Sequence, residues 1–414
     1  RWLKFVKYLR EFGWEPIVFT PENPETPVDD ETLLKEVPVG IQVVKNRIWE
    51  PYSVYKTLTG RKSEKIQTAF LKEKKGSGGL LESFSVWIRG NLFIPDARKF
   101  WIKPSVKYLK DILQTERVDA IISTGPPHST HLIAMKLKQE LGLPWLADFR
   151  DPWTNIDYYQ DLRLGKRADK IHHQLEKKVL QQADAVTVVS PGMVKDFSAI
   201  VDRNYHFIPN GFDAEDLQVA KKKIEVDKHF SITHIGSLTK SRNPEKLWQV
   251  LGELVHEKED FSKDLKIHNI GKLDFSVKET IGQNGLEKFL QLTDYLPHNE
   301  VITKQQEAAV LLLLINNTPN ANLILTGKIF EYLTSKRPII CIAPIDGDAA
   351  NIIRETGSGE VFDFSEAKKL KDYILKLYEL FKKGKLAAES QNIERFERKN
   401  LTGDLVKVLG ELTA

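Results

Sequence analysis

Short apolar runs alternate with amphipathic segments along this chain. The runs at residues 119–123, 144–149 and 185–189 each have the length of a buried strand. Apolar residues recur at helical spacing over 129–141 and 166–183, and Gly142 is placed to end the first of these helices. A further helix is predicted to start at residues 190–192. Strands that alternate with helices predict a parallel sheet covered by helices on both faces.

A second series of the same kind begins near residue 230. Its strands are predicted at residues 231–236, 266–271, 309–315 and 338–342, and its helices at 244–255 and 328–335. The break between the two series lies near residues 209–211 and the basic stretch 221–223. We therefore expect an α/β protein of two doubly wound Rossmann-like domains that face each other across a cleft. Ligands of such sheets bind beyond the carboxyl ends of the strands.

The opening of the chain has an unusual pattern. Trp2, Phe5, Val6 and Leu9 follow helical spacing, and the strand-like residues 16–19 come after them. A doubly wound domain normally begins with a strand and a turn before its first helix. We expect that this first strand is missing from the sequence.

Length and composition narrow the class of protein. A chain of 414 residues is too long for one ordinary core, so two domains are expected. No run of about 18 apolar residues occurs, so no segment is predicted to span a bilayer. The single cysteine, Cys341, excludes an internal disulfide framework and fits a reducing compartment. The expected location is the cytoplasm.

The net charge of +4 is concentrated in the first half of the chain. Basic residues gather between 45 and 110, and residues 62–79, which end in a glycine-rich stretch, are predicted to form a mobile loop. Such a surface could attract anionic lipid headgroups, as a peripheral contact at the inner membrane face, or a diphosphate-bearing acceptor. For this segment alone a solvated loop is the favoured alternative. Nucleic acid is not an expected partner, because no stripe of basic and aromatic residues is present.

Several common motifs are absent. The chain has no G-x-G-x-x-G, and Gly327-Lys328 lacks the residues that complete a phosphate-binding P-loop. There is no H-E-x-x-H, and His128 and His131, three residues apart, have no third ligand nearby. We expect neither a metal ion nor a bound cofactor.

The segment around Lys328 and Glu331 carries the clearest positive signal. Thr326 and Gly327 precede a K-x-x-E-Y string that opens a predicted helix, where a cation and amide donors suit phosphate and the carboxylate suits ribose hydroxyls. An ordinary exposed i, i+3 ion pair is the alternative. The string resembles the signature of the family 4 (group 1) retaining glycosyltransferases, which have the GT-B fold. The resemblance implies domains at residues 1–212 for the acceptor and 213–390 for the donor, with a helix at 391–414 that crosses back to the first domain.

Further donor residues follow from this resemblance. Gly236 and Ser237 end a predicted strand where the backbone of such enzymes approaches the diphosphate, and Arg242 would neutralise it. Tyr295 and Leu296 match the turn that receives the nucleobase. Asn320 lies in the loop where the donor sugar is expected. The nucleoside-diphosphate sugar would be a co-substrate.

The first half of the chain offers candidate acceptor residues after two predicted strands. His128 follows one strand, and Asp148, Arg150 and Asp151 follow the next, in stretches similar to a bacterial surface-glycan subgroup of the family. An aspartate could deprotonate an acceptor hydroxyl and Arg150 could bind an acceptor phosphate. Many members have a histidine at the position of Arg150. A buried Asp–Arg network, and a helix-capping role for His128, are equally weighted alternatives.

One departure from the family pattern leaves alternatives open. The family often has a second glutamate eight positions before Glu331, where this chain has Leu323. The favoured function is metal-independent, retaining transfer of a hexose or related sugar to a glycan or lipid-linked acceptor. A catalytically silent glycan- or nucleotide-binding protein and a sugar-nucleotide epimerase on the same fold are the alternatives. A metal-dependent enzyme using Asp346-Gly347-Asp348 is a weaker one, because that string suits a turn before a helix.

Overall fold

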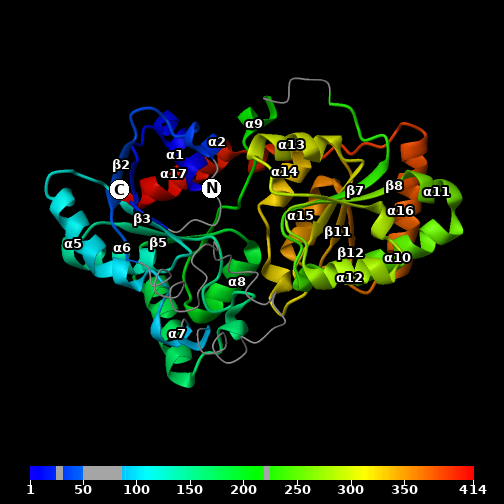
Figure 1. Cartoon of the computed structure of the whole chain (residues 1–414). Coiled ribbons are helices and arrows are strands. Elements are labelled where there is room, and N and C mark those ends of the chain that lie inside the picture. The colour runs from blue at the N-terminus through cyan, green and yellow to red at the C-terminus, as the bar shows by residue number, and fades with distance from the viewer. Residues whose placement is uncertain (25–30, 50–85, 89, 219–223) are drawn as a thin grey trace. The chain divides into compact units, whose positions relative to one another are not determined.

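The computed structural model divides the chain into two compact units (Figure 1). It describes residues 1–24, 31–49, 86–88, 90–218 and 224–414. The first unit comprises Trp2–Pro209 and Thr402–Ala414, and the second comprises Arg1 and Asn210–Leu401. The predicted mobile loop at 62–79, most of the basic residues near it and the stretch 221–223 lie outside the described residues.

The first unit contains two parallel sheets. Strands β3, β4, β5 and β6 are neighbours in that order in one sheet, and β1 and β2 form a separate pair. The elements are α1 (Trp2–Leu9), η1 (Arg10–Phe12), β1 (Ile17–Pro21), α2 (Glu31–Leu34), β2 (Gln42–Asn46), η3 (Lys99–Trp101), α5 (Ile102–Leu113), β3 (Ile121–Gly125), α6 (Ser129–Leu141), β4 (Trp145–Phe149), η4 (Tyr159–Leu162), α7 (Lys166–Gln182), β5 (Ala185–Val188), α8 (Pro191–Ile200) and β6 (His206–Phe207).

Local signals explain where helices of this unit begin and end. Helix α6 ends at Gly142, whose φ of 71° is the left-handed conformation that glycine adopts without strain. Helix α8 begins after Ser190, whose hydroxyl accepts the Met193 amide, with Pro191 in the first turn. Both boundaries confirm the predictions from sequence.

The second unit contains one parallel sheet of six strands in the order β12-β11-β10-β7-β8-β9. Its elements are α9 (Ala214–Gln218), β7 (Phe230–Ile235), η5 (Lys240–Arg242), α10 (Glu245–Glu257), α11 (Glu259–Asp264), β8 (Leu265–Ile270), α12 (Phe275–Gln283), η6 (Glu287–Phe289), β9 (Leu290–Thr293), α13 (His298–Glu307), β10 (Val310–Leu314), η7 (Ala321–Leu323), α14 (Lys328–Thr334), β11 (Ile339–Ile342), α15 (Asp348–Thr356), β12 (Gly359–Phe362), α16 (Ala367–Lys382) and η8 (Glu394–Phe396).

This strand order is that of a Rossmann-type sheet. The chain builds β7, β8 and β9 outward in one direction and then returns to place β10, β11 and β12 on the other side of β7. The order therefore reverses between β7 and β10. In doubly wound sheets the crevice at such a reversal, beyond the carboxyl ends of the strands, is where ligands bind.

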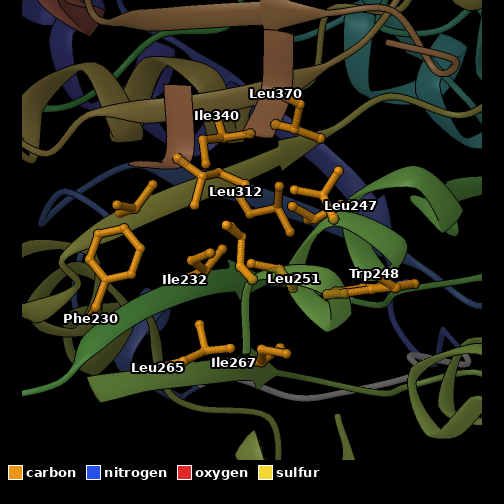
Figure 2. Close-up of a cluster of buried hydrophobic side chains, with 14 of the residues drawn as sticks. Phe230, Ile232, Leu247, Trp248, Leu251, Leu265, Ile267, Leu312, Ile340 and Leu370 are labelled. Carbon is orange, nitrogen blue, oxygen red and sulfur yellow. The ribbon is translucent and has the colours of Figure 1, made fainter. Parts of the chain in front are cut away.

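Apolar side chains between this sheet and its helices form a hydrophobic core (Figure 2). Phe230 and Ile232 from β7 lie in one cluster with Trp248 and Leu251 from α10, and each of the four is at most 1% exposed. A second cluster lies around α14 and α15 and includes Ile329 and Phe330. Burial on both faces accounts for the nearly continuous apolar runs by which these strands were predicted.

Two details of the second unit bear on the sequence predictions. Helix α15 begins at Asp348 with Gly347 at its amino-terminal cap. The string Asp346-Gly347-Asp348 is thus a turn into a helix, as expected of it. The last helix, α17 (Arg398–Thr413), begins in the second unit and belongs to the first unit from Thr402 onward.

Candidate functional site

Lys328 lies at the reversal point of the six-stranded sheet. It is half-buried at the start of α14, and its side chain lies against Gly236, the residue after β7. A Cβ added at Gly236 would lie 2.8 Å from Lys328 Cε, and the φ of Gly236 is +119°. The backbone conformation favours glycine here, and a side chain would in addition push the end of Lys328 away from this position.

The charge of Lys328 is poorly stabilised in this structure. Burial and the nearby Arg242 guanidinium lower the pKa of its ammonium group to about 8, and Glu331 opposes that shift. Two cations thus lie close enough to repel each other. An anion placed between them would relieve both the burial cost and the repulsion, which is the electrostatic character of a phosphate site.

Arg242 joins the two strands at which the strand order reverses. It lies in η5 after β7, and its Nε donates to Oδ1 of Asn316, the buried residue shortly after β10. Its Nη1 lies 3.5 Å from the Ser237 carbonyl oxygen. The Asn317 amide donates to the Ser241 carbonyl at 2.7 Å. These bonds hold the guanidinium at the carboxyl edge of the sheet.

Glu331, one turn after Lys328, is held by a residue that the sequence analysis did not identify. Its Oε2 accepts a hydrogen bond of 2.8 Å from Nε2 of Gln305 on α13. The next residue, Tyr332, is buried, and its hydroxyl accepts the Ile235 amide at 3.2 Å. Helix α14 is thereby attached to β7 at the strand end that carries Gly236.

The remaining predicted donor residues lie on neighbouring loops of the same sheet. Tyr295 and Leu296 follow β9, with Tyr295 62% exposed and Leu296 packed against the core cluster beneath it. Asn320 is buried and accepts from the Thr318 hydroxyl at 2.9 Å. The Thr326 hydroxyl lies 3.4 Å from the Lys328 amide, and Gly327 caps α14. The structure thus brings Gly236, Ser237, Arg242, Lys328 and Glu331 together.

His234 is a further residue that the sequence analysis did not identify. It is buried two residues before Gly236, and its Nδ1 lies 3.1 Å from the Leu312 carbonyl oxygen. Burial, Lys328 and Arg242 lower the pKa of its imidazole well below the usual value. Since a carbonyl only accepts, Nδ1 carries the proton of this neutral ring. The available signal was its place near the carboxyl end of the predicted strand, where ligands of such sheets bind.

In the first unit, Asp148 is an interior carboxylate. It is fully buried at the end of β4 and accepts from Trp2 Nε1 at 2.7 Å and from the Thr124 and Thr187 hydroxyls at 2.8 Å each. These bonds tie α1 and two neighbouring strands to β4. Asp148 therefore lies in a buried network with a tryptophan and two threonines, whereas the alternative considered from sequence named an Asp–Arg network. Asp151 in contrast is exposed.

Arg150 and His128 lie around the turn after β3. The Arg150 amide donates to the Gly125 carbonyl at 2.9 Å, and its Nη2 donates to the Pro126 carbonyl. His128 is buried and stacks on Trp153, with ring centroids 4.4 Å apart. The capping role considered for His128 is wrong: its side chain makes no capping bond, and the Asp96 carboxylate accepts the Ser129 amide instead.

The neighbouring His131 belongs to a buried hydrogen-bonded group. Trp145 Nε1 donates to the Ser123 hydroxyl, whose oxygen lies 2.8 Å from His131 Nδ1. Burial lowers the pKa of His131 to about 3 and lowers that of His128 well below its usual value. Both rings are neutral, and the described residues contain no group of three or more side chains able to hold a metal ion.

Helix α7 supports the loop that follows Asp151. Its Glu176 is 1% exposed and accepts from the Trp153 and Thr154 amides at 3.2 Å and from the Thr154 hydroxyl. Its His172 accepts from Trp153 Nε1 at 3.0 Å. Trp153 is therefore fixed on one side by α7 and on the other by stacking on His128.

Comparisons with known proteins are consistent with this arrangement. A family model described as a glycosyl transferase 4-like domain matches residues 1–211, half of the chain. No curated protein matches the sequence. Across the described residues, no helix combines the length and the apolar character that crossing a bilayer requires.

Three solved structures share the fold. A sucrose-phosphate synthase from Thermosynechococcus elongatus superposes over 99% of this chain and 92% of its own, with a TM-score of 0.60 and 13% identity. An α,α-trehalose-phosphate synthase (UDP-forming) from Burkholderia xenovorans, in complex with glucose-6-phosphate, superposes over 75% of this chain and 77% of its own, with a TM-score of 0.53 and 10% identity. A TarM variant from S. aureus, in complex with UDP, superposes over 74% of this chain and 58% of its own, with a TM-score of 0.52 and 15% identity.

Identities this low show a common fold and do not establish a common substrate. The family match covers the first unit, and the superpositions extend the shared fold to the rest of the chain. The chain belongs to the glycosyl transferase 4-like family and is a glycosyltransferase with the GT-B fold of two Rossmann-like domains.

Proposed function

We propose that this enzyme transfers a hexose or related sugar from a nucleoside-diphosphate sugar to a glycan or lipid-linked acceptor, without a metal ion or a bound cofactor. The observation that carries the proposal is the cation site at the strand reversal of the second unit. There Lys328 lies against Gly236, with Arg242 and Glu331 close enough to shift its pKa. Two half-buried cations beside a strand that ends in glycine suit a diphosphate.

These cations would act on the departing nucleoside diphosphate. As the bond between the sugar and the diphosphate breaks, negative charge builds on the diphosphate, and Lys328 and Arg242 stabilise that charge in place of a metal ion. Arg242 is already oriented by Asn316, so little reorganisation is needed when the charge develops. Retention of configuration is proposed from the family resemblance.

The rest of the donor is assigned to the loops around this point. Glu331 would accept hydrogen bonds from the ribose hydroxyls. Tyr295 and Leu296 would contact the nucleobase, since their loop follows β9 at the same edge of the sheet. Asn320, Ser237, Thr326 and Gly327 would contact the sugar and the phosphates.

The acceptor residues are proposed in the first unit. Arg150 would bind an acceptor phosphate, and the exposed Asp151 would accept the proton of the attacking hydroxyl. Asp148 and His128 are buried, so we assign them the positioning of these two residues. A bacterial surface glycan, a cytoplasmic location and peripheral contact with the inner membrane face belong to the same proposal.

Calorimetric titration of the protein with UDP, GDP, ADP and CMP, in the presence and absence of EDTA, tests the donor site. We expect one nucleotide to bind equally well with and without EDTA. Glu331→Ala should weaken that binding by roughly tenfold, because a charge-assisted hydrogen bond is lost. Glu300→Ala, an exposed glutamate on α13, is the matched control.

Each other outcome favours an alternative. Binding that EDTA abolishes would contradict metal independence. Binding without transfer to any member of a broad acceptor panel would favour a silent binding protein, which the leucine at position 323 also suits. Conversion of the nucleotide sugar without an acceptor would indicate an epimerase. Failure of all four nucleotides to bind would refute the donor site.

A further inference from the structure

The buried side-chain amide of Gln305 is hydrogen-bonded to Glu331, the carboxylate that we propose binds the ribose. Gln305 is 2% exposed and lies on the inner face of α13, where Ile302 is the other buried residue. Its Nε2 donates to Glu331 Oε2 at 2.8 Å. A polar side chain in such a position costs free energy unless it is hydrogen-bonded, so the bond to Glu331 accounts for a glutamine where an apolar residue would pack.

This hydrogen bond restrains a carboxylate that lies among cations. Glu331 interacts electrostatically with Lys328, and also with Arg398 at the start of α17, whose pKa is lowered by burial to about 10. Either cation could draw a freely rotating glutamate toward itself. A bond from Gln305 holds one oxygen in place. A carboxylate has about four acceptor positions, so acceptor capacity remains for two ribose hydroxyls.

We infer that Gln305 is a positioning residue that orients Glu331 toward the ribose diol and thereby makes the donor site prefer ribonucleotides to deoxyribonucleotides. The inference rests on the proposed donor site. A positioning role differs from a merely structural one in a way that can be measured. In a positioning role, Gln305 contributes to binding only when the ligand carries ribose hydroxyls.

The test compares ligands that differ only at the ribose. UDP, GDP and ADP, each with its 2′,3′-dideoxy counterpart, are titrated calorimetrically into the wild type, Gln305→Met, Gln306→Met, Glu331→Gln and the variant that combines Gln305→Met with Glu331→Gln. Met is close to Gln in size, and Gln306, half-buried on the same helix, is the matched control. Thermal unfolding of each variant checks that it folds, and Gln305→Asn, which keeps an amide but shortens its reach, serves as a second variant.

The wild type should bind the ribonucleotide roughly tenfold or more tightly than its dideoxy counterpart. Gln305→Met should reduce this ratio by about three- to tenfold and leave dideoxynucleotide affinity unchanged, whereas Gln306→Met should alter neither. In the Glu331→Gln background Gln305→Met should have no further effect, since the two residues act as a unit.

Two results would overturn the inference. An equal loss of affinity for both ligands in Gln305→Met would show that the glutamine only supports the fold, and an unchanged ratio would show that it does not act on Glu331. In both cases the wild type still binds nucleotide, so the proposed function survives. If the wild type binds none of the six ligands, the proposed function fails together with the inference.

Discussion

At the scale of single residues, the donor site depends on a lysine whose charge is poorly stabilised. Lys328 lies against the backbone of Gly236 and beside Arg242, and its pKa is lowered to about 8. A bound diphosphate would raise that pKa again, because it places further negative charge beside the ammonium group. Binding of nucleotide and protonation of Lys328 are therefore linked.

This linkage predicts a pH dependence of nucleotide affinity. At about pH 7 Lys328 is protonated. As the pH rises through about 8 the free protein loses this proton, and nucleotide affinity should fall by up to about tenfold per pH unit. Calorimetry from about pH 7 to about pH 10 measures this fall, in a range where the terminal phosphate of the nucleotide stays ionised. Lys328→Met should bind more weakly and lack this step, and a step of the same size in that variant would contradict the assignment.

Gly236→Ala should damage both the fold and the site. The new Cβ would meet Lys328 Cε at 2.8 Å, and alanine would have to adopt a φ of +119°. We expect a loss of about 1–3 kcal/mol in unfolding free energy together with weaker nucleotide binding. Gly410→Ala on α17 is the control, because a Cβ there meets nothing within 4 Å. Denaturant unfolding measures the stability of both variants, and calorimetry measures their nucleotide affinity. Equal effects of the two substitutions would show that position 236 does not require glycine.

At the scale of elements, helix α7 holds the candidate acceptor loop in place. Glu176 accepts the Trp153 and Thr154 amides, and His172 accepts from the Trp153 indole. Burial raises the pKa of Glu176, although these hydrogen bonds oppose the shift. A buried carboxylate that satisfies two backbone amides is costly to remove, since its partners are left without acceptors.

Glu176→Ala should therefore destabilise the first unit by about 2–4 kcal/mol. Lys177→Ala, the exposed neighbour on the same helix, should change stability by less than about 0.5 kcal/mol. Denaturant unfolding followed by tryptophan fluorescence measures both, because Trp153 lies at the contact. A loss in Glu176→Ala no larger than that of the control would mean that the loop does not depend on this carboxylate.

At the scale of the whole molecule, the end of the chain completes the first unit. From Thr402 onward α17 belongs to that unit, and Leu405 and Leu409 are 1% exposed. A Cβ at Gly403 would lie 3.4 Å from the Phe12 ring, so the helix packs closely against the first turns of the chain. Residues about 390 positions apart along the chain thus lie against each other.

Leu405→Ala should lower the stability of the first unit by about 2–5 kcal/mol through the cavity it leaves. Nucleotide binding should be retained at a temperature where the variant is folded, because the proposed donor site lies wholly within the second unit. Lys407→Ala, exposed on the same helix, is the control. Calorimetric unfolding and nucleotide titration of both variants test this, and a loss of nucleotide affinity in Leu405→Ala alone would contradict it.

The sequence by itself determined the elements and the class of fold. Period and capping residues placed α6 at 129–141 and the start of α8 at Ser190, because these signals act over a few neighbouring residues. The K-x-x-E string and Gly236 were identified in the same way, as local patterns that resemble a known family. The parallel strands could be predicted from apolar runs, because strands buried on both faces of a sheet have nearly continuous apolar sequences.

Only the tertiary structure decided how these pieces meet. That Lys328 lies against Gly236, about 90 residues away in the chain, follows from the strand order of the sheet, and so does the bond from Arg242 to Asn316. The same reason explains why Gln305 and His234 were missed and why Asp148 proved to be an interior residue. Polar side chains carry no local signal of their partners, since a hydrogen bond depends on distance in space and not along the chain.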